Sequence, residues 1–304
     1  MTRSPLTRVA DALAPAATAV RPAVLRLGIG AYSAINNGRR RPMLRKLHRQ
    51  GAEQFAPVGP CRILKRPLPP RVADALFDAA QVVNALATLG VAHRVTGPLN
   101  SALQLWTLSY RNSWGMIFHN DNQSVLHQAV LGVSPAADAL SVDALVARRP
   151  LGPPAFARRY GIVATACNVA TLAVYFISGV AKVRSPKGWA WAGGDTLREQ
   201  IAADAVRKEV FGATAPEMAG RLYRSERGFG LLGVGTLIVE LGAPLALAHR
   251  RLGQAFALAA WGLHMGIRVV MGIKFTYNLT GVSYLPLFPA GPQLPPVRPL
   301  LALR

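Results

Sequence analysis

The sequence predicts an all-α fold, a multi-pass transmembrane helical bundle. Of its 304 residues, 51% are hydrophobic and only 16% are charged, a balance more typical of membrane proteins than of soluble enzymes. Residues 161–181 contain no Asp, Glu, Lys or Arg. These residues, at about 1.5 Å each in a helix, match a hydrocarbon core of roughly 30 Å. We therefore expect a multi-pass cell-membrane protein with about six spans.

The N-terminal region is predicted to be basic and to precede the bundle. Its apolar stretch, residues 24–35, is too short to span a membrane alone, so it either extends across Pro22 with a kink or lies among the headgroups. A strongly basic run follows at 39–49. The predicted organisation is a basic N-terminal region, a transmembrane domain and a Pro-rich tail, at residues 1–70, 71–290 and 291–304.

The apolar segments give the expected spans in order. The first contains Asp78 and Asn84, which must face protein rather than lipid. The third is weakly hydrophobic and interrupted by Pro135, and the fifth has Glu240 as its single charge. The expected spans are residues 73–92, 98–116, 123–139, 161–181, 228–248 and 252–273, with a shorter apolar piece at 275–289.

Residues 189–227 are amphipathic and mixed in charge, which predicts an interfacial helix over the end of the fourth span. Thr196-Leu-Arg-Glu199 is typical of a capping box at a helix start. One apolar face is expected from Leu197, Ile201, Ala205 and Val206.

The net charge of +21 indicates contact with an anionic partner. No nucleic-acid motif is present, so lipid headgroups rather than nucleic acid are the expected partner. Basic residues precede residues 161–181 and follow residues 228–248, which places both short loops in the cytoplasm and Lys182 at the extracytoplasmic boundary. If every later segment crosses the membrane fully, the basic run at 39–49 would lie on the outer side, against the preference of basic residues for the cytoplasm. Either one early segment is re-entrant or the first apolar piece does not cross, so the location of the N-terminus stays open.

Lys182 follows the longest uncharged stretch, where by position alone it is an interfacial anchor. Its segment, Tyr175-Phe-Ile-Ser-Gly-Val-Ala-Lys182 followed by Trp189 and Trp191, closely resembles the part of the vitamin K-dependent gamma-carboxylases that carries their active-site base. It also resembles the bacterial HTTM membrane proteins. Two further patches, residues 141–149 and 240–275, agree with the resemblance in order and spacing.

The resemblance implies that Lys182 is a base for a quinol, such as menaquinol or vitamin K hydroquinone, with Tyr175 and Trp189 in contact with it. The same alignment puts Asp138 where the carboxylases have a catalytic histidine. An Asp can orient a lysine by accepting a hydrogen bond, but its charge opposes deprotonation of that lysine. We therefore do not expect gamma-carboxylation itself.

Glu240 lies in the middle of an expected span and needs a partner or a proton. His264 and Arg268, four residues apart on the next span, are the expected partners. These residues could have a function, as a proton relay or a contact to a quinone headgroup. Alternatively, they form a structural pair between helices.

The remaining polar and small residues predict structural roles. His119, Asp121 and His127 lack a standard ligand spacing, so no metal is expected. Asp143 is expected to cap the helix that follows it. Glycines 228, 230, 233 and 235 indicate close helix packing rather than a phosphate loop, and cysteines 61 and 167 are expected to be free thiols.

Three functional classes follow. The first is a quinol-linked or lipid-linked enzyme with Lys182 as base, Asp138 orienting it, and His264 or Glu240 in the proton path. The second is a non-catalytic membrane component whose polar residues hold the helices together, and the third is a quinone- or lipid-binding protein without turnover. The sequence leaves open whether the chain is an enzyme, and it identifies no protein partner.

Overall fold

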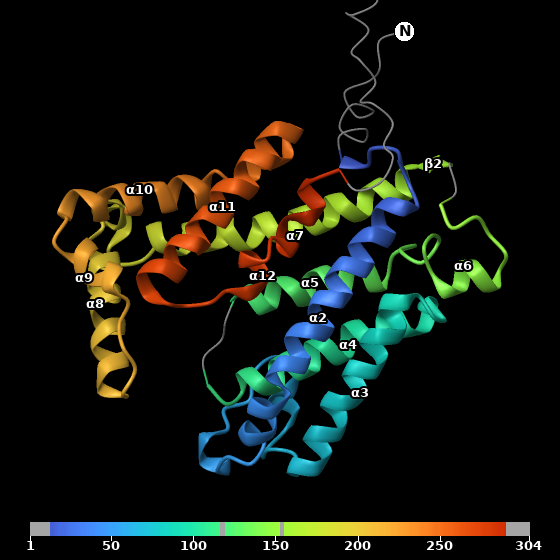
Figure 1. Cartoon of the computed structure of the whole chain (residues 1–304), viewed down its shortest axis with the longest axis horizontal. Coiled ribbons are helices and arrows are strands. Elements are labelled where there is room, and N and C mark those ends of the chain that lie inside the picture. Colours follow the sequence, from blue (N-terminus) through green and yellow to red (C-terminus); the bar gives the residue numbers. More distant parts are fainter. Residues whose placement is uncertain (1–12, 116–118, 153–154, 290–304) are drawn as a thin grey trace, which may run out of the picture. The chain divides into compact units, whose positions relative to one another are not determined.

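The computed structural model describes residues 13–115, 119–152 and 155–289, and it is mostly helical (Figure 1). This confirms the all-α class. Two-residue strands, β1 (Ala17–Thr18) and β2 (Phe156–Ala157), pair antiparallel. The chain divides into two compact units, with the boundary after Asn168 inside a single helix. The Pro-rich tail predicted for residues 291–304 lies outside the described residues.

The described part of the first unit contains four long helices, one short helix and the beginning of α7 (Arg158–Val183). Helix α4 packs against both α3 and α5, and α2 packs against α3 and α5. Their bounds are α2 (Val20–Leu47), α3 (Pro70–Leu89), α4 (His93–Asn112), α5 (His119–Gly132) and α6 (Val142–Val146), with short 3₁₀ turns at Ala52–Gln54 and Gly59–Ile63.

Helix α2 is much longer than the apolar stretch that predicted it. Pro22 lies in its first turn, where a missing N–H is tolerated, and the helix continues through the basic run. The acidic and amide side chains of α3 face it. Asp78 accepts two hydrogen bonds from Arg41, and the buried Asn84 donates to the carbonyl of Gly30 at 3.1 Å. Asp78 and Asn84 therefore face protein, as predicted.

The ends of α3 and α4 follow from local sequence. Pro70 begins α3, and Gly90 ends it with a φ of +69° that favours glycine. Asp143 then accepts hydrogen bonds from the backbone N–H groups of Ala92 and His93, at 2.7 and 2.8 Å. Asp143 thus caps α4 rather than the helix after it, which is capped by Ser141.

Arg26 joins three segments of the first unit. Its buried guanidinium donates to the carbonyls of Thr88 at the end of α3, and of Ala136 and Leu140 in the turns before α6. Burial lowers the pKa of Arg26 to about 10, so the group stays charged at neutral pH. No helical periodicity points to such an arginine, and the sequence reading missed it.

The second and third expected spans differ from the helices found. Pro98 lies inside α4 rather than at its start. Helix α5 ends at Gly132, and its 14 residues extend only about 21 Å, less than a hydrocarbon core. The expected span at 123–139 is therefore not one continuous helix.

The second unit, Val169–Leu287, contains the C-terminal part of α7 and the helices that follow. Its main core gathers Leu172, Tyr175, Phe256 and Tyr284. The elements are α7 (Arg158–Val183), η3 (Gly188–Gly193), α8 (Asp195–Val210), α9 (Glu217–Tyr223), α10 (Glu226–Leu241), η4 (Ala243–Leu247), α11 (Arg250–Met271), α12 (Thr276–Leu279) and η5 (Val282–Leu287).

Two expectations for this unit need correction. The predicted capping box at Thr196 is absent, because α8 starts at Asp195 after Gly194 with no side-chain cap. The expected span at 228–248 is divided, because α10 ends at Leu241 and a 3₁₀ turn with Pro244 near its start follows. Of the predicted apolar face, Ile201 is buried but Val206 is exposed.

Among the described residues, two helices are long and apolar enough to cross a membrane, namely α3 and α7. This finding rests on length and composition alone, so it is weak support for membrane association and gives no support for a particular number of spans. Both helices overlap spans that the sequence predicts.

Candidate functional site

Lys182 lies in the last turn of α7, and its ammonium binds a carboxylate from α10. Its Nζ donates to Oε1 and Oε2 of Glu240 at 2.6 and 2.7 Å. The Lys182 side chain is 22% exposed and that of Glu240 only 8%. The two opposite charges form an ion pair with a buried acid and a partly accessible amine.

Gly179 explains why the two helices approach so closely here. It lies three residues before Lys182, on the same face of α7. A Cβ at this position would stand 2.9 Å from Cβ of Glu240 and 3.0 Å from a methyl of Leu241. The glycine therefore leaves the space that brings Glu240 within reach of the lysine.

A tryptophan covers the lysine, and it is Trp191 rather than Trp189. The Nζ of Lys182 lies 5.4 Å from the Trp191 ring centroid, within the range of a cation–π contact. Trp191 is 9% exposed, whereas Trp189, the residue predicted to contact a cofactor, is 68% exposed. A Cβ on Gly233 of α10 would meet the carbonyl oxygen of Trp191 at 2.8 Å, so this glycine provides the predicted close packing.

Glu240 binds Lys182 of α7, a residue 58 positions away in the chain. The sequence predicted partners on the neighbouring span, His264 and Arg268, and did not predict this contact.

His264 belongs to a second buried cluster in the same unit. Its Nδ1 lies 2.8 Å from the carbonyl of Ala260 and 3.3 Å from the hydroxyl of Tyr175. Because a carbonyl can only accept, this nitrogen carries the proton. The Tyr175 hydroxyl is 2.6 Å from that of Tyr284, and Asn278 donates to both. Tyr175, predicted to contact a quinol, thus has its hydroxyl engaged by protein groups.

Asp138 lies in the first unit and binds the first turn of α7. It accepts hydrogen bonds from the Tyr160 hydroxyl at 2.8 Å and from Arg159 at 3.3 Å. Lys182 is in the last turn of the same helix, and the carboxylate that holds it is Glu240. The carboxylate that the structure places on Lys182 is thus that of Glu240, whereas the contacts of Asp138 are with Tyr160 and Arg159.

The residues considered for a metal have other contacts. The His119 side chain lies outside the described residues. Asp121 is bound by Arg40 and Arg111, and the buried His127 lies 3.0 Å through Nε2 from the carbonyl of Cys167. Cys167 and Cys61 are both free thiols, as predicted.

The arrangement at Lys182 can hold and transfer a proton. An amine and a carboxylate joined by two short hydrogen bonds can exchange one proton without moving a heavy atom, and the exposed part of the lysine gives a bound molecule access to it. Sequence reasoning found Lys182 and Glu240 but missed their contact. The signal for it was Gly179, one turn before the lysine. Comparison of the chain with protein-family models, with curated proteins and with solved structures finds no match.

Proposed function

We propose that the chain is a multi-pass membrane protein of the HTTM and gamma-carboxylase-like type, in which Lys182 and Glu240 form a proton-transfer centre for a quinol-linked or lipid-linked reaction. The observation that carries the proposal is the ion pair of Lys182 with Glu240. It joins the residue that the resemblance names as base to the single acid of the expected fifth span. Gamma-carboxylation itself is not proposed.

The distribution of polar and apolar side chains supports the membrane part of the proposal. In α3, α4 and α5, amide side chains are buried while large aliphatic side chains are exposed, the arrangement expected where lipid rather than water surrounds the helices. The buried amides are Asn84, Asn100, Gln104, Gln123 and Gln128, and the exposed aliphatic residues include Val82, Leu86, Leu89, Leu99 and Leu105.

Helix α10 supports it in a second way. Leu231, Val234 and Ile238 are all exposed. They recur at intervals of three and four residues, so they form one apolar stripe along the helix. A lipid environment would cover this stripe, while Glu240 on the same helix is directed to Lys182.

The proposed chemistry starts from the paired state. Transfer of one proton from Lys182 to Glu240 along an existing 2.6 Å hydrogen bond converts the ion pair into a neutral amine and a carboxylic acid. The neutral amine then accepts a proton from a quinol hydroxyl. After this step Lys182 is again an ammonium, Glu240 holds the first proton, and the quinol is an anion stabilised by the adjacent ammonium.

The surroundings of Lys182 fit a quinol in part. The Lys182 side chain is partly exposed, and the largely buried Trp191 ring lies beside its ammonium. Tyr175 fits less well, because its hydroxyl already bonds Tyr284 and Asn278. We therefore assign quinol contact to Lys182 and Trp191 and give Tyr175 a supporting position.

A second candidate function is favoured by the same ion pair. A bidentate pair between two helices is also what a non-catalytic membrane component needs to hold α7 and α10 together. In that case the pair would bind no small molecule, and the protein would need it only for stability.

Mass spectrometry of the detergent-purified protein separates the two functions. The variants are Lys182→Met, the double variant Lys182→Met/Glu240→Gln, and Lys187→Met as a matched control at an exposed lysine of the same segment. The double variant removes both charges and so tests ligand loss without an unpaired acid. We expect a stoichiometric quinone or lipid with the wild type and with Lys187→Met, and its loss from the double variant. Equal ligand content in all folded variants would favour the structural function.

A further inference from the structure

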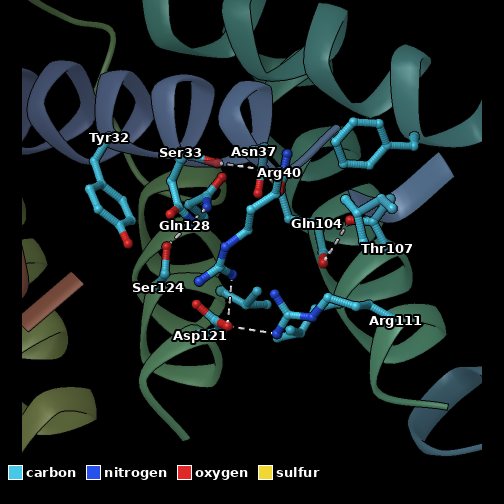
Figure 2. A pocket seen from close by; sticks show the side chains of 15 residues that line it. Tyr32, Ser33, Asn37, Arg40, Gln104, Thr107, Arg111, Asp121, Ser124 and Gln128 are labelled. Carbon is cyan, nitrogen blue, oxygen red and sulfur yellow. Dashed lines mark hydrogen bonds and ion pairs between the residues drawn. The ribbon is translucent and has the colours of Figure 1, made fainter. Parts of the chain in front are cut away.

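A polar cavity lies in the first unit, between α2, α4 and α5 (Figure 2). Its volume is about 40 Å³. A cavity needs roughly 10–15 Å³ for each water, so this one holds about three waters or one small oxyanion. The labelled side chains around it are amides, hydroxyls, two arginines and one carboxylate, and four apolar side chains are also part of the lining.

The charged groups of the cavity leave one positive charge in excess. Arg40 from α2 and Arg111 from α4 both donate to the same oxygen of Asp121, Oδ2, at 3.1 and 2.6 Å. Figure 2 shows the two guanidinium groups converging on this carboxylate from different helices. Two cations against one anion, the charged side chains lining the cavity, give a net charge of +1.

The two arginines also have hydrogen-bonding capacity to spare. A guanidinium has five N–H donors. Among the described residues, Arg40 bonds only to Asp121, and Arg111 bonds to Asp121 and Asn112 through one nitrogen. The Arg40 side chain is 25% exposed, so its unused donors can be reached from outside. A planar fork of such donors matches the oxygens of a phosphate group.

The neutral wall of the cavity is fixed in place by a chain of amides. Asn37 donates to Gln104 at 3.2 Å, Gln104 donates to Asn100 at 3.3 Å, and Asn100 donates to Gln128 at 2.9 Å. This series holds the amide groups in one orientation, so the cavity is already formed without a ligand. Three helices contribute to it, which makes it a built feature of the first unit.

We infer that this cavity binds one phosphate-type oxyanion, held between Arg40 and Arg111. A phosphodiester carries a single negative charge and balances the excess of +1, and its size suits the cavity. The phosphate belongs either to a lipid headgroup or to free phosphate, and the site is independent of Lys182.

Thermal unfolding of the protein in a non-ionic, phosphate-free detergent tests the inference. One arm adds inorganic phosphate, with chloride adjusted to constant ionic strength. The other adds mixed micelles of phosphatidylglycerol, compared with the same micelles containing diacylglycerol, which carries no phosphate. The variants are Arg40→Gln and Arg111→Gln, each of which leaves Asp121 with one arginine, and Asp121→Asn. Arg39→Gln is the control, because it removes the same charge from α2 outside the cavity.

We expect phosphate or phosphatidylglycerol to raise the Tm of the wild type and of Arg39→Gln. Stabilisation by both ligands means free phosphate suffices, and stabilisation by the lipid alone identifies a headgroup site. Arg40→Gln and Arg111→Gln should bind the effective ligand at least about tenfold more weakly. Asp121→Asn should bind it more tightly, because it removes the competing carboxylate, an effect that a purely structural ion cluster would not produce. The inference is overturned if neither ligand acts on the wild type, or if Arg39→Gln loses the response as fully as Arg40→Gln.

Discussion

Removing the lysine of the Lys182–Glu240 pair should destabilise the protein strongly, whereas removing both partners should not. The change Lys182→Met keeps the length and apolar bulk of the side chain but leaves Glu240, which is 8% exposed, without its cation. Breaking a buried pair in this way costs about 3–5 kcal/mol. Because the lysine end of the pair is partly open to solvent, we take the lower value, about 3 kcal/mol.

The assay is thermal unfolding in detergent, followed by tryptophan fluorescence, which Trp191 beside the lysine makes sensitive to this site. A loss of about 3 kcal/mol corresponds to a fall in Tm of roughly 6–12 °C. The double variant Lys182→Met/Glu240→Gln should recover most of that loss, giving a coupling energy of at least about 2 kcal/mol. The exposed pair Lys187–Glu199 is the matched control, with an expected coupling below about 1 kcal/mol. Equal stability of the single and double variants would refute the contact.

Three further predictions concern other parts of the chain. Gly233→Ala should destabilise the protein by about 1–3 kcal/mol, because its Cβ would meet two carbonyl oxygens at 2.8 Å. Gly235→Ala on the same helix should not, because a Cβ there has nothing within 4 Å. Chemical denaturation of the two variants compares their free energies of unfolding. Asp143→Ala should cost about 1–2 kcal/mol by removing the cap of α4, measured as a lower Tm, and an unchanged Tm would contradict the capping geometry. Burial raises the pKa of the Cys61 thiol to about 11. Iodoacetamide should therefore label it slowly in the folded protein at pH 8 and faster at pH 10, and rapid labelling at pH 8 would contradict its burial.

The all-α class and helix α7 could be predicted because both depend on the local pattern of apolar and charged residues. Residues 161–181 form the greater part of α7, because an uncharged run of this length favours a helix whichever elements pack against it. Boundaries were predicted less well where packing competes with local preference. Pro98 was expected to start a helix, yet α4 begins at His93, where the Asp143 carboxylate caps its first turn from a segment 50 residues away.

The sequence could predict which residues belong to the candidate site, but not which of them are partners. Lys182 and Glu240 stand out in the sequence because charges are rare in apolar segments, but the partner of each depends on how the helices pack. Asp138 was suggested by its alignment position rather than by packing, and the structure shows its contacts with Tyr160 and Arg159. Arg26 could not be found at all, because the carbonyls that it binds become neighbours only in the folded unit.

Infrared difference spectroscopy on the purified protein, before and after addition of a menaquinol analogue, would test most directly whether Glu240 takes up a proton when a quinol gives one to Lys182. We expect the C=O stretch of a protonated carboxyl group to appear with the wild type and with Lys187→Met, and to be missing with Glu240→Gln. No such band with the wild type, or a band that persists in Glu240→Gln, would contradict the assignment of this pair as the proton-transfer centre.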